Sequence, residues 1–283
     1  MNLFEAIFLG IIQGLSEFLP ISSTAHLTLT GKLLMNDMIK NHPERWTAFM
    51  AVIQLGTLLA VLIYFYKDIY IIVKDFLSEN LVARIKISEQ SQSSRLGWLI
   101  IAGSIPIGVI GLSFKDAIEG DFTKNLYVIS CSLIVLGILL AIAEKISSFK
   151  KDMDNLTWKD SVIIGLAQSL ALIPGSSRSG TSITAGLFLG FNRETAARFS
   201  FLLSIPAVFA SGLLELKKSL QWLDSSMTIN LIVSTLASFI VGYIAIDFLL
   251  KYLRKNSTFI FVYYRIALGI LILCLIGFGV ISM

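Results

Sequence analysis

Long apolar stretches separated by short polar connections make up most of this chain. Six of them have a length close to the ~20 residues that a helix needs to cross a bilayer once. These six segments are 47–66, 96–114, 125–143, 195–216, 229–250 and 260–281. The pattern predicts an all-α polytopic membrane protein, organised as a single membrane domain over 1–283, with six transmembrane helices.

Two further apolar segments, 3–35 and 161–191, are too long for one crossing and are interrupted by clusters of Pro, Gly and Ser. A backbone that leaves the helical conformation at membrane depth is tolerated only inside protein or beside a wet cavity. We therefore expect each segment to form a re-entrant helix–loop–helix that dips into the membrane and returns to the same side.

The basic residues support this topology. The three connections richest in Lys and Arg are 67–95, 144–160 and 251–258. Short basic loops lie on the cytoplasmic side of a membrane. These three share one side only if both long segments are re-entrant, and both termini then face outside.

A short internal repeat relates the two long segments. One carries Gly10-Ile-Ile-Gln13 and Pro20-Ile-Ser22-Ser23-Thr24, and the other carries Gly165-Leu-Ala-Gln168 and Pro174-Gly-Ser176-Ser177-Arg178, with one gap between them. The units start from opposite sides of the membrane, so we predict inverted repeats over approximately 1–150 and 151–283. Inverted repeats with broken helices place a binding site near the midplane, where the two breaks meet.

Composition agrees with a membrane protein and excludes several classes. The chain is 55% hydrophobic and 15% charged, with a mean hydropathy of +0.78, which a soluble domain of 283 residues does not show. The net charge of +4 is small, and the basic residues lie mostly in short loops. Both observations argue against a nucleic-acid partner. Cys131 and Cys274 each fall in an apolar segment, and we expect buried free thiols.

The second long segment, from Ser161 to Phe191, carries one charged side chain, the guanidinium of Arg178. It lies at the break. A lone guanidinium in hydrocarbon is penalised by at least ~2.5 kcal/mol, so Arg178 requires an anionic partner in the protein or in a ligand. A helix that begins beside it presents free N–H groups, which form an anion site. Alternatively, the small residues form a helix-packing motif, which leaves the arginine unexplained. The expected phosphate-binding residues are Gly175, Ser176, Ser177, Arg178, Ser179 and Gly180, together with Ser22 and Thr24 of the first break.

The break in the first long segment offers a carboxylate, a hydroxyl and an imidazole. Glu17 is an intramembrane carboxylate, a functional candidate by default, and a structural ion pair with Arg178 is the alternative. Ser23 needs a base to act as a nucleophile, and His26 lies one helical turn further on. Ser22 is better explained as a helix cap, with Thr24 beside it. One break thus supplies reactive groups and the other an anion cradle, which suggests phosphoryl transfer on a lipid substrate.

At these residues the chain resembles the bacitracin-resistance family of undecaprenyl-diphosphate phosphatases. The resemblance covers essentially the whole chain, and its specific matches are Gln13-x-x-x-Glu17-Phe-Leu-Pro-Ile-Ser-Ser-Thr-Ala-His26 and Pro174-Gly-Ser-Ser-Arg-Ser-Gly180. It implies a multi-pass protein of the bacterial plasma membrane, active on the outer face, that cleaves a polyprenyl diphosphate to the monophosphate and inorganic phosphate. This recycles the lipid carrier of cell-wall synthesis and confers bacitracin resistance.

The resemblance also implies a divalent cation, Mg²⁺ or Ca²⁺, and active-site roles for Glu17, Ser23, His26 and Arg178. The family accepts Glu or Gln at the first position of its motif, and Gln13 occupies it here. Glu17 is then the one carboxylate of that motif, so water and substrate phosphate would complete the metal shell.

Several alternatives stay open at the level of sequence. Ser23 is expected to attack the terminal phosphorus with His26 as base, or water attacks directly and Ser23 is only a ligand. A transporter or lipid flippase has the same inverted-repeat architecture, but it needs no nucleophile. Asp247 and Arg265 are either partners of each other or interface residues. A homodimer is left open.

Overall fold

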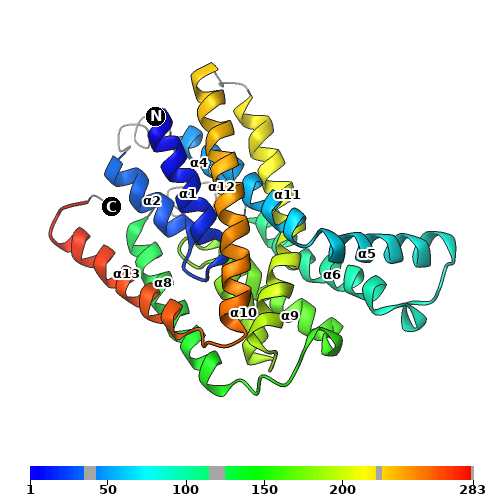
Figure 1. Ribbon diagram of the computed structural model, residues 1–283. Coiled ribbons are helices and arrows are strands. Elements are labelled where there is room, and N and C mark those ends of the chain that lie inside the picture. The colour runs from blue at the N-terminus through cyan, green and yellow to red at the C-terminus, as the bar shows by residue number, and fades with distance from the viewer. Residues whose placement is uncertain (35–42, 115–124, 221–224, 282–283) are drawn as a thin grey trace.

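The computed structural model of the protein describes residues 1–34, 43–114, 125–220 and 225–281 (Figure 1). Within these ranges the regular elements are helices. One isolated β-bridge pairs Lys151 with Phe191. Six of the helices are long and apolar enough to span a bilayer. They are α4 (Pro43–Tyr64), α6 (Gln92–Ser113), α8 (Leu126–Ile146), α11 (Arg193–Ser219), α12 (Ser225–Leu253) and α13 (Phe259–Gly277). The predicted all-α polytopic fold is confirmed.

Both long apolar segments form a helix, a break and a second helix, as the sequence predicts. The first consists of α1 (Leu3–Phe18) and α2 (Ser23–Leu34), and the second of α9 (Trp158–Ser169), a short 3₁₀ turn and α10 (Arg178–Phe188). The α8–α9 and α12–α13 connections lie at one end of the bundle, and α1 starts at the other (Figure 1). Re-entry depends on where the bilayer lies, and it stays a prediction together with the inverted repeat.

The first break follows from residues that cannot continue α1. Leu19 is extended and precedes Pro20, which has no N–H to donate. Ser22 has a positive φ of 75°, and its Oγ accepts the N–H of Ala25 at 3.3 Å. The predicted capping role of Ser22 is confirmed, and the capped helix α2 begins at Ser23.

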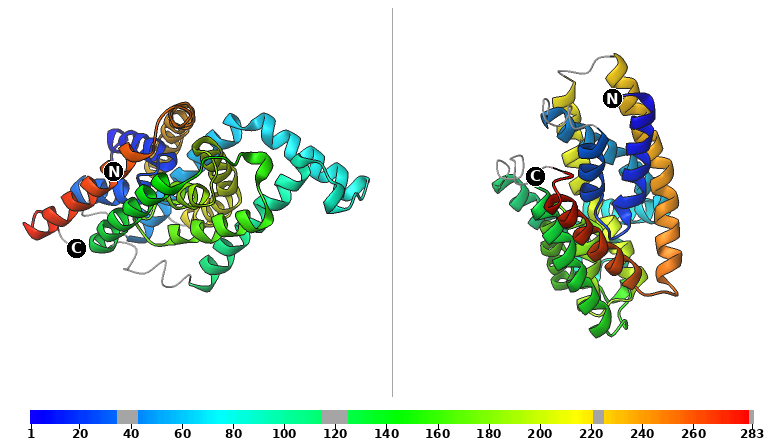
Figure 2. Two further views of the ribbon diagram at one scale, coloured as in Figure 1. Left: turned by 90° about the horizontal axis from the view of Figure 1, so that it is seen from below. Right: turned by 90° about the vertical axis from the view of Figure 1, so that its left-hand side faces the viewer.

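Small residues set the close packing of the helices that hold the first break. A Cβ on Gly14 of α1 would lie 2.8 Å from the backbone of α12 at Ser238 and Gly242. On another face of α12, Ser238 Oγ donates to Ile53 O of α4 at 2.7 Å. Close approach of backbones through small residues is how membrane helices associate. Helix α12 therefore lies between α1 and α4 and fixes both (Figures 1 and 2).

The second break is held by two other helix pairs. Helix α9 contacts α6 where Gly165 meets the backbone of Gly103, and Ser161 Oγ donates to Leu99 O at 2.5 Å. Helices α8 and α13 pack side by side (Figure 2) through Gly269, whose Cβ would lie 3.0 Å from Ser130 O. Helix α5 (Tyr66–Leu77) continues from α4 and, with the start of α6, projects from the bundle.

The remaining described elements are short: Ser78–Val82, Ile87–Glu89 and Met153–Asn155 lie on polar connections, and Leu170–Leu172 is the 3₁₀ turn between α9 and α10. Cys131 on α8 and Cys274 on α13 are free thiols, as expected, but they are exposed rather than buried. They lie on outward helix faces, which in a membrane contact lipid instead of protein, so an apolar segment does not by itself imply burial.

Candidate active site

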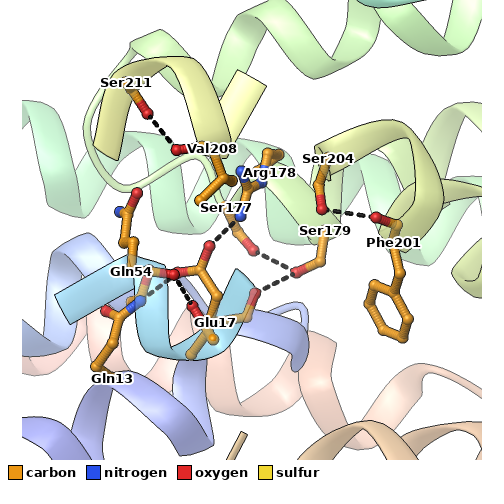
Figure 3. Close-up of polar contacts among 12 residues, drawn as sticks. Gln13, Glu17, Gln54, Ser177, Arg178, Ser179, Phe201, Ser204, Val208 and Ser211 are labelled. Atoms are coloured by element: carbon orange, nitrogen blue, oxygen red, sulfur yellow. Dashed lines mark hydrogen bonds and ion pairs between the residues drawn. The ribbon is translucent and has the colours of Figure 1, made fainter. Parts of the chain in front are cut away.

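The two breaks meet around the carboxylate of Glu17, which is 7% exposed. Glu17 Oε2 accepts Gln13 Nε2 at 2.9 Å and Ser23 Oγ at 2.7 Å. Its other oxygen, Oε1, pairs with Nη2 of Arg178 (Figure 3). The arginine therefore has the anionic partner that membrane depth requires, and the partner comes from the opposite break.

Serine hydroxyls connect the backbones of the two breaks as well. Ser179 Oγ lies within hydrogen-bond distance of the carbonyls of Glu17, at 3.3 Å, and Leu19, at 3.2 Å. The same oxygen lies 3.2 Å from Ser177 Oγ, which accepts the N–H of Gly180 at 3.1 Å and so caps α10 (Figure 3). Arg178 is the first residue of α10, so its side chain and the positive end of the helix dipole lie together.

A cavity of about 540 Å³ opens beside these groups. Such a volume is typical of small-molecule sites, which occupy about 300–1,000 Å³. Its lining includes eight of the predicted site residues: Glu17, Ser22, Ser23, Thr24, Gly175, Ser176, Ser177 and Arg178. Ser176 lines this cavity, and its buried Oγ has no hydrogen-bond partner within the described protein.

The other predicted residues lie behind the cavity wall. Gln13 is buried below Glu17, Ser179 contacts the first break, and a Cβ on Gly180 would collide with the guanidinium of Arg265. His26 does not line the cavity either. These residues hold the wall in place, and a direct contact with phosphate is supported only for the lining residues.

The hydrogen bonds of Ser23 and His26 differ from the pairing that their spacing suggests. Ser23 donates to Glu17, whereas His26 Nδ1 lies 2.7 Å from Ser22 O and Nε2 lies 2.6 Å from Tyr264 Oη. A carbonyl only accepts, so Nδ1 carries the proton and Nε2 accepts from the tyrosine. The imidazole stacks on Tyr264, with ring centroids 5.5 Å apart. Glu17 is therefore the base within reach of Ser23.

The donor set is compatible with a divalent cation that relies on its substrate. Among the described residues no group of three His, Cys, Asp or Glu side chains could hold a metal. Glu17 offers a carboxylate, and Gln13 Oε1 beside it is buried without a hydrogen-bond partner in that part of the chain. Mg²⁺ commonly binds one or two carboxylates, water and substrate phosphates. These residues fit such an ion but do not form a protein-only cage.

Arg265 is a site residue that the sequence interpretation missed. It is fully buried on α13 and donates to backbone carbonyls of both breaks, including Pro20 O at 3.2 Å and Ser176 O at 2.9 Å. It does not pair with Asp247, which accepts from Lys251 at 2.7 Å. The argument from membrane depth that singled out Arg178 applies equally to Arg265 and could have identified it.

A substitution at Gly175 tests how closely the second break must pack. Its φ is +86°, and an added Cβ would lie 2.5 Å from Ile129 O. Gly175→Ala should lower the thermal stability of the detergent-solubilised protein, since the left-handed conformation alone costs about 1–2 kcal/mol, and should reduce activity. Gly277→Ala, where nothing lies within 4 Å, is the control. Unchanged melting of Gly175→Ala would contradict this packing.

Comparison with known proteins agrees with the geometry. The sequence profile of the family described as "Bacitracin resistance protein BacA" matches residues 6–271. A protein of Syntrophobacter fumaroxidans named "Undecaprenyl-diphosphatase" is 56% identical over 269 residues, covering 95% of both chains. One of the same name from Chloroherpeton thalassium is 52% identical over 288 residues, covering 99% of this chain and 98% of its own. The chain belongs to the bacitracin resistance protein BacA family.

Proposed function

We propose that this chain hydrolyses undecaprenyl diphosphate to undecaprenyl phosphate and inorganic phosphate, and thereby recycles the lipid carrier of cell-wall synthesis. The observation that carries the proposal is the convergence of Glu17, Ser23 and Arg178 from two distant breaks on one cavity. The names of its close relatives support the same reaction. Bacitracin resistance follows from removal of the diphosphate form of the carrier.

Binding of the substrate rearranges the charges of the site. The terminal phosphate binds to Arg178 and to the serine hydroxyls of the second break, because a guanidinium matches phosphate oxygens with a planar fork. The phosphate thereby replaces Glu17 as the partner of Arg178. Glu17 Oε1 is then free of the guanidinium, while Oε2 keeps its hydrogen bonds to Ser23 and Gln13.

The first chemical step forms a bond between Ser23 Oγ and the terminal phosphorus. The bond from that phosphorus to the bridging oxygen breaks, and undecaprenyl phosphate leaves. Glu17 accepts the proton of Ser23, with which it already shares a hydrogen bond of 2.7 Å. Water then attacks the phosphorus of the phosphoserine, the bond to Ser23 Oγ breaks as Oγ takes the proton back from Glu17, and inorganic phosphate leaves with the protons of the water. His26 keeps Ser22 in place beside the nucleophile through Nδ1.

A bound Mg²⁺ or Ca²⁺ would be held by Glu17 and Gln13 and would neutralise phosphate charge. We place the enzyme in the bacterial plasma membrane with its cavity open to the outer side. The three most basic connections support this orientation, since they belong on the cytoplasmic side.

Phosphate trapping tests the nucleophile. Rapid acid quenching of the enzyme with terminally labelled prenyl diphosphate should leave label on the wild type and none on Ser23→Ala, because Ser23 is the cavity hydroxyl that donates to the carboxylate of Glu17. Ser22→Ala, next to it, is the control and should retain label. Activity in Ser23→Ala close to that of the wild type would instead support direct attack by water. Phosphate release in detergent, without two compartments, separates hydrolysis from transport.

A further inference from the structure

The cavity extends well beyond the polar groups of the two breaks. Its other walls are mainly one face of α6 and one face of α11, completed by Thr47 and Gln54 of α4 and by Ala171 and Leu172 of the second break. On α6 the lining residues are Ser104, Ile107, Gly108, Gly111 and Leu112, spaced by three and four residues as one helical face requires. On α11 they are Pro206, Ala207, Ala210, Ser211, Leu214 and Glu215, also one face. The cavity therefore extends from the two breaks as a groove along α6 and α11, with α4 beside it.

The glycines of the α6 wall have no packing role. Nothing lies within 4 Å of a Cβ added to Gly108 or Gly111. Gly103, one to two turns earlier on the same helix, differs, because its Cβ would lie 2.8 Å from Leu203 and 2.7 Å from Ser161 Oγ. Small residues in membrane helices normally allow close helix contact, and glycine is unfavourable in a helix interior. At Gly108 and Gly111 the missing side chain leaves space in the groove.

The lining of the groove matches a ligand with a charged head and an apolar chain. Its polar end holds Arg178 and the buried, unpartnered Ser176 Oγ. Along α6 and α11 the walls are mainly aliphatic or lack side chains, and the polar exceptions are Ser104, Ser211 and Glu215, which pairs with Lys218. A binding site that leads from an anion cradle to a mainly apolar wall suits a prenyl diphosphate, whose two parts have these properties.

We propose that Gly108 and Gly111 form the subsite for the isoprene units next to the diphosphate and determine recognition of the prenyl chain. This inference rests on the proposed function for the identity of the substrate. A cavity of about 540 Å³ holds the head group and only the nearest units of an undecaprenyl chain. The remaining chain leaves between α6 and α11 into the bilayer. Recognition therefore depends on the first isoprene units and not on the total length of the prenyl chain.

Added bulk in the groove gives the first test. Gly108→Leu and Gly111→Leu should raise KM for undecaprenyl and farnesyl diphosphate about tenfold or more, the effect of losing contact with a few methylene groups, and change kcat far less. Val109→Phe adds the same number of carbon atoms on the neighbouring, exposed residue outside the lining, and should leave KM unchanged. Equal effects of Val109→Phe and Gly111→Leu, or no effect of any of them, would overturn the subsite.

A binding experiment that needs no turnover gives the second test. In a background with Cys131→Ser and Cys274→Ser, Gly111→Cys introduces one thiol in the groove and Val109→Cys one thiol outside it. Farnesyl phosphate should slow maleimide labelling at 111 several-fold and not at 109, and inorganic phosphate should protect neither. Equal labelling with and without farnesyl phosphate would refute the subsite. If the wild type released no phosphate from prenyl diphosphates, the proposed function would fail. The protection result would still show whether the groove binds a prenyl chain.

Discussion

Arg178→Ala is expected to lower kcat/KM for undecaprenyl diphosphate by about 10³-fold or more, because an arginine on a transferring phosphoryl group contributes about 10³–10⁵. The guanidinium lies at the start of α10 and on the cavity wall, where the terminal phosphate binds. Its loss also leaves the buried Glu17 without its cation. Phosphate release from the detergent-solubilised enzyme measures the effect.

Two further variants separate the contribution of the positive charge, the contribution of the planar guanidinium and a general loss of activity on removal of an arginine. Arg178→Lys keeps the charge but loses the planar fork, so its activity should fall between those of the wild type and Arg178→Ala. Arg198→Ala removes an arginine that pairs with Asp68 at 2.9 Å outside the cavity, and should leave kcat unchanged. Activity of Arg178→Ala within a few-fold of the wild type would exclude Arg178 from phosphate binding.

The sequence was sufficient to predict the elements that carry the site. Pro20 and Pro174 interrupt apolar segments that are too long for one span, and both interruptions are present. Arg178 was expected to have an anionic partner in the protein or in a ligand, and in the structure Glu17 is that partner. These predictions succeeded because the bilayer core contains no water. Polar backbone groups and charges there must find partners within the protein, whatever the sequence.

Contacts between distant helices could not be predicted in the same way. The spacing of Ser23 and His26 suggested a pair, but Tyr264 on α13 holds the imidazole from 238 positions away along the chain. The glycines of α6 look alike in sequence, yet Gly103 packs against α9 and Gly111 borders a cavity. In each case the outcome depends on which helix lies opposite, and the periodicity of a single helix carries no such information.

Arg265→Met is expected to reduce both stability and turnover, because Arg265 joins both breaks to the rest of the bundle. Its guanidinium reaches Pro20 O in the first break, Ser176 O in the second, and Leu133 O of α8 at 3.3 Å. A buried acceptor that loses its donor costs about 1–3 kcal/mol, and this substitution affects several at once. Misplacement of catalytic groups by about 1 Å can reduce the rate about 10²-fold.

The predicted role of Arg265 is positioning, and a second arginine allows it to be distinguished from a general effect on folding. Arg193 pairs with Glu144, which also accepts Thr258 Oγ1 at 2.9 Å, away from the cavity lining. Arg193→Met should lower the melting temperature but leave kcat of the folded fraction near the wild-type value. Arg265→Lys, which keeps the charge but reaches fewer carbonyls, should melt closer to the wild type than Arg265→Met and still show a reduced kcat. If kcat of folded Arg265→Lys equals that of the wild type, the two breaks do not need this arginine for their alignment.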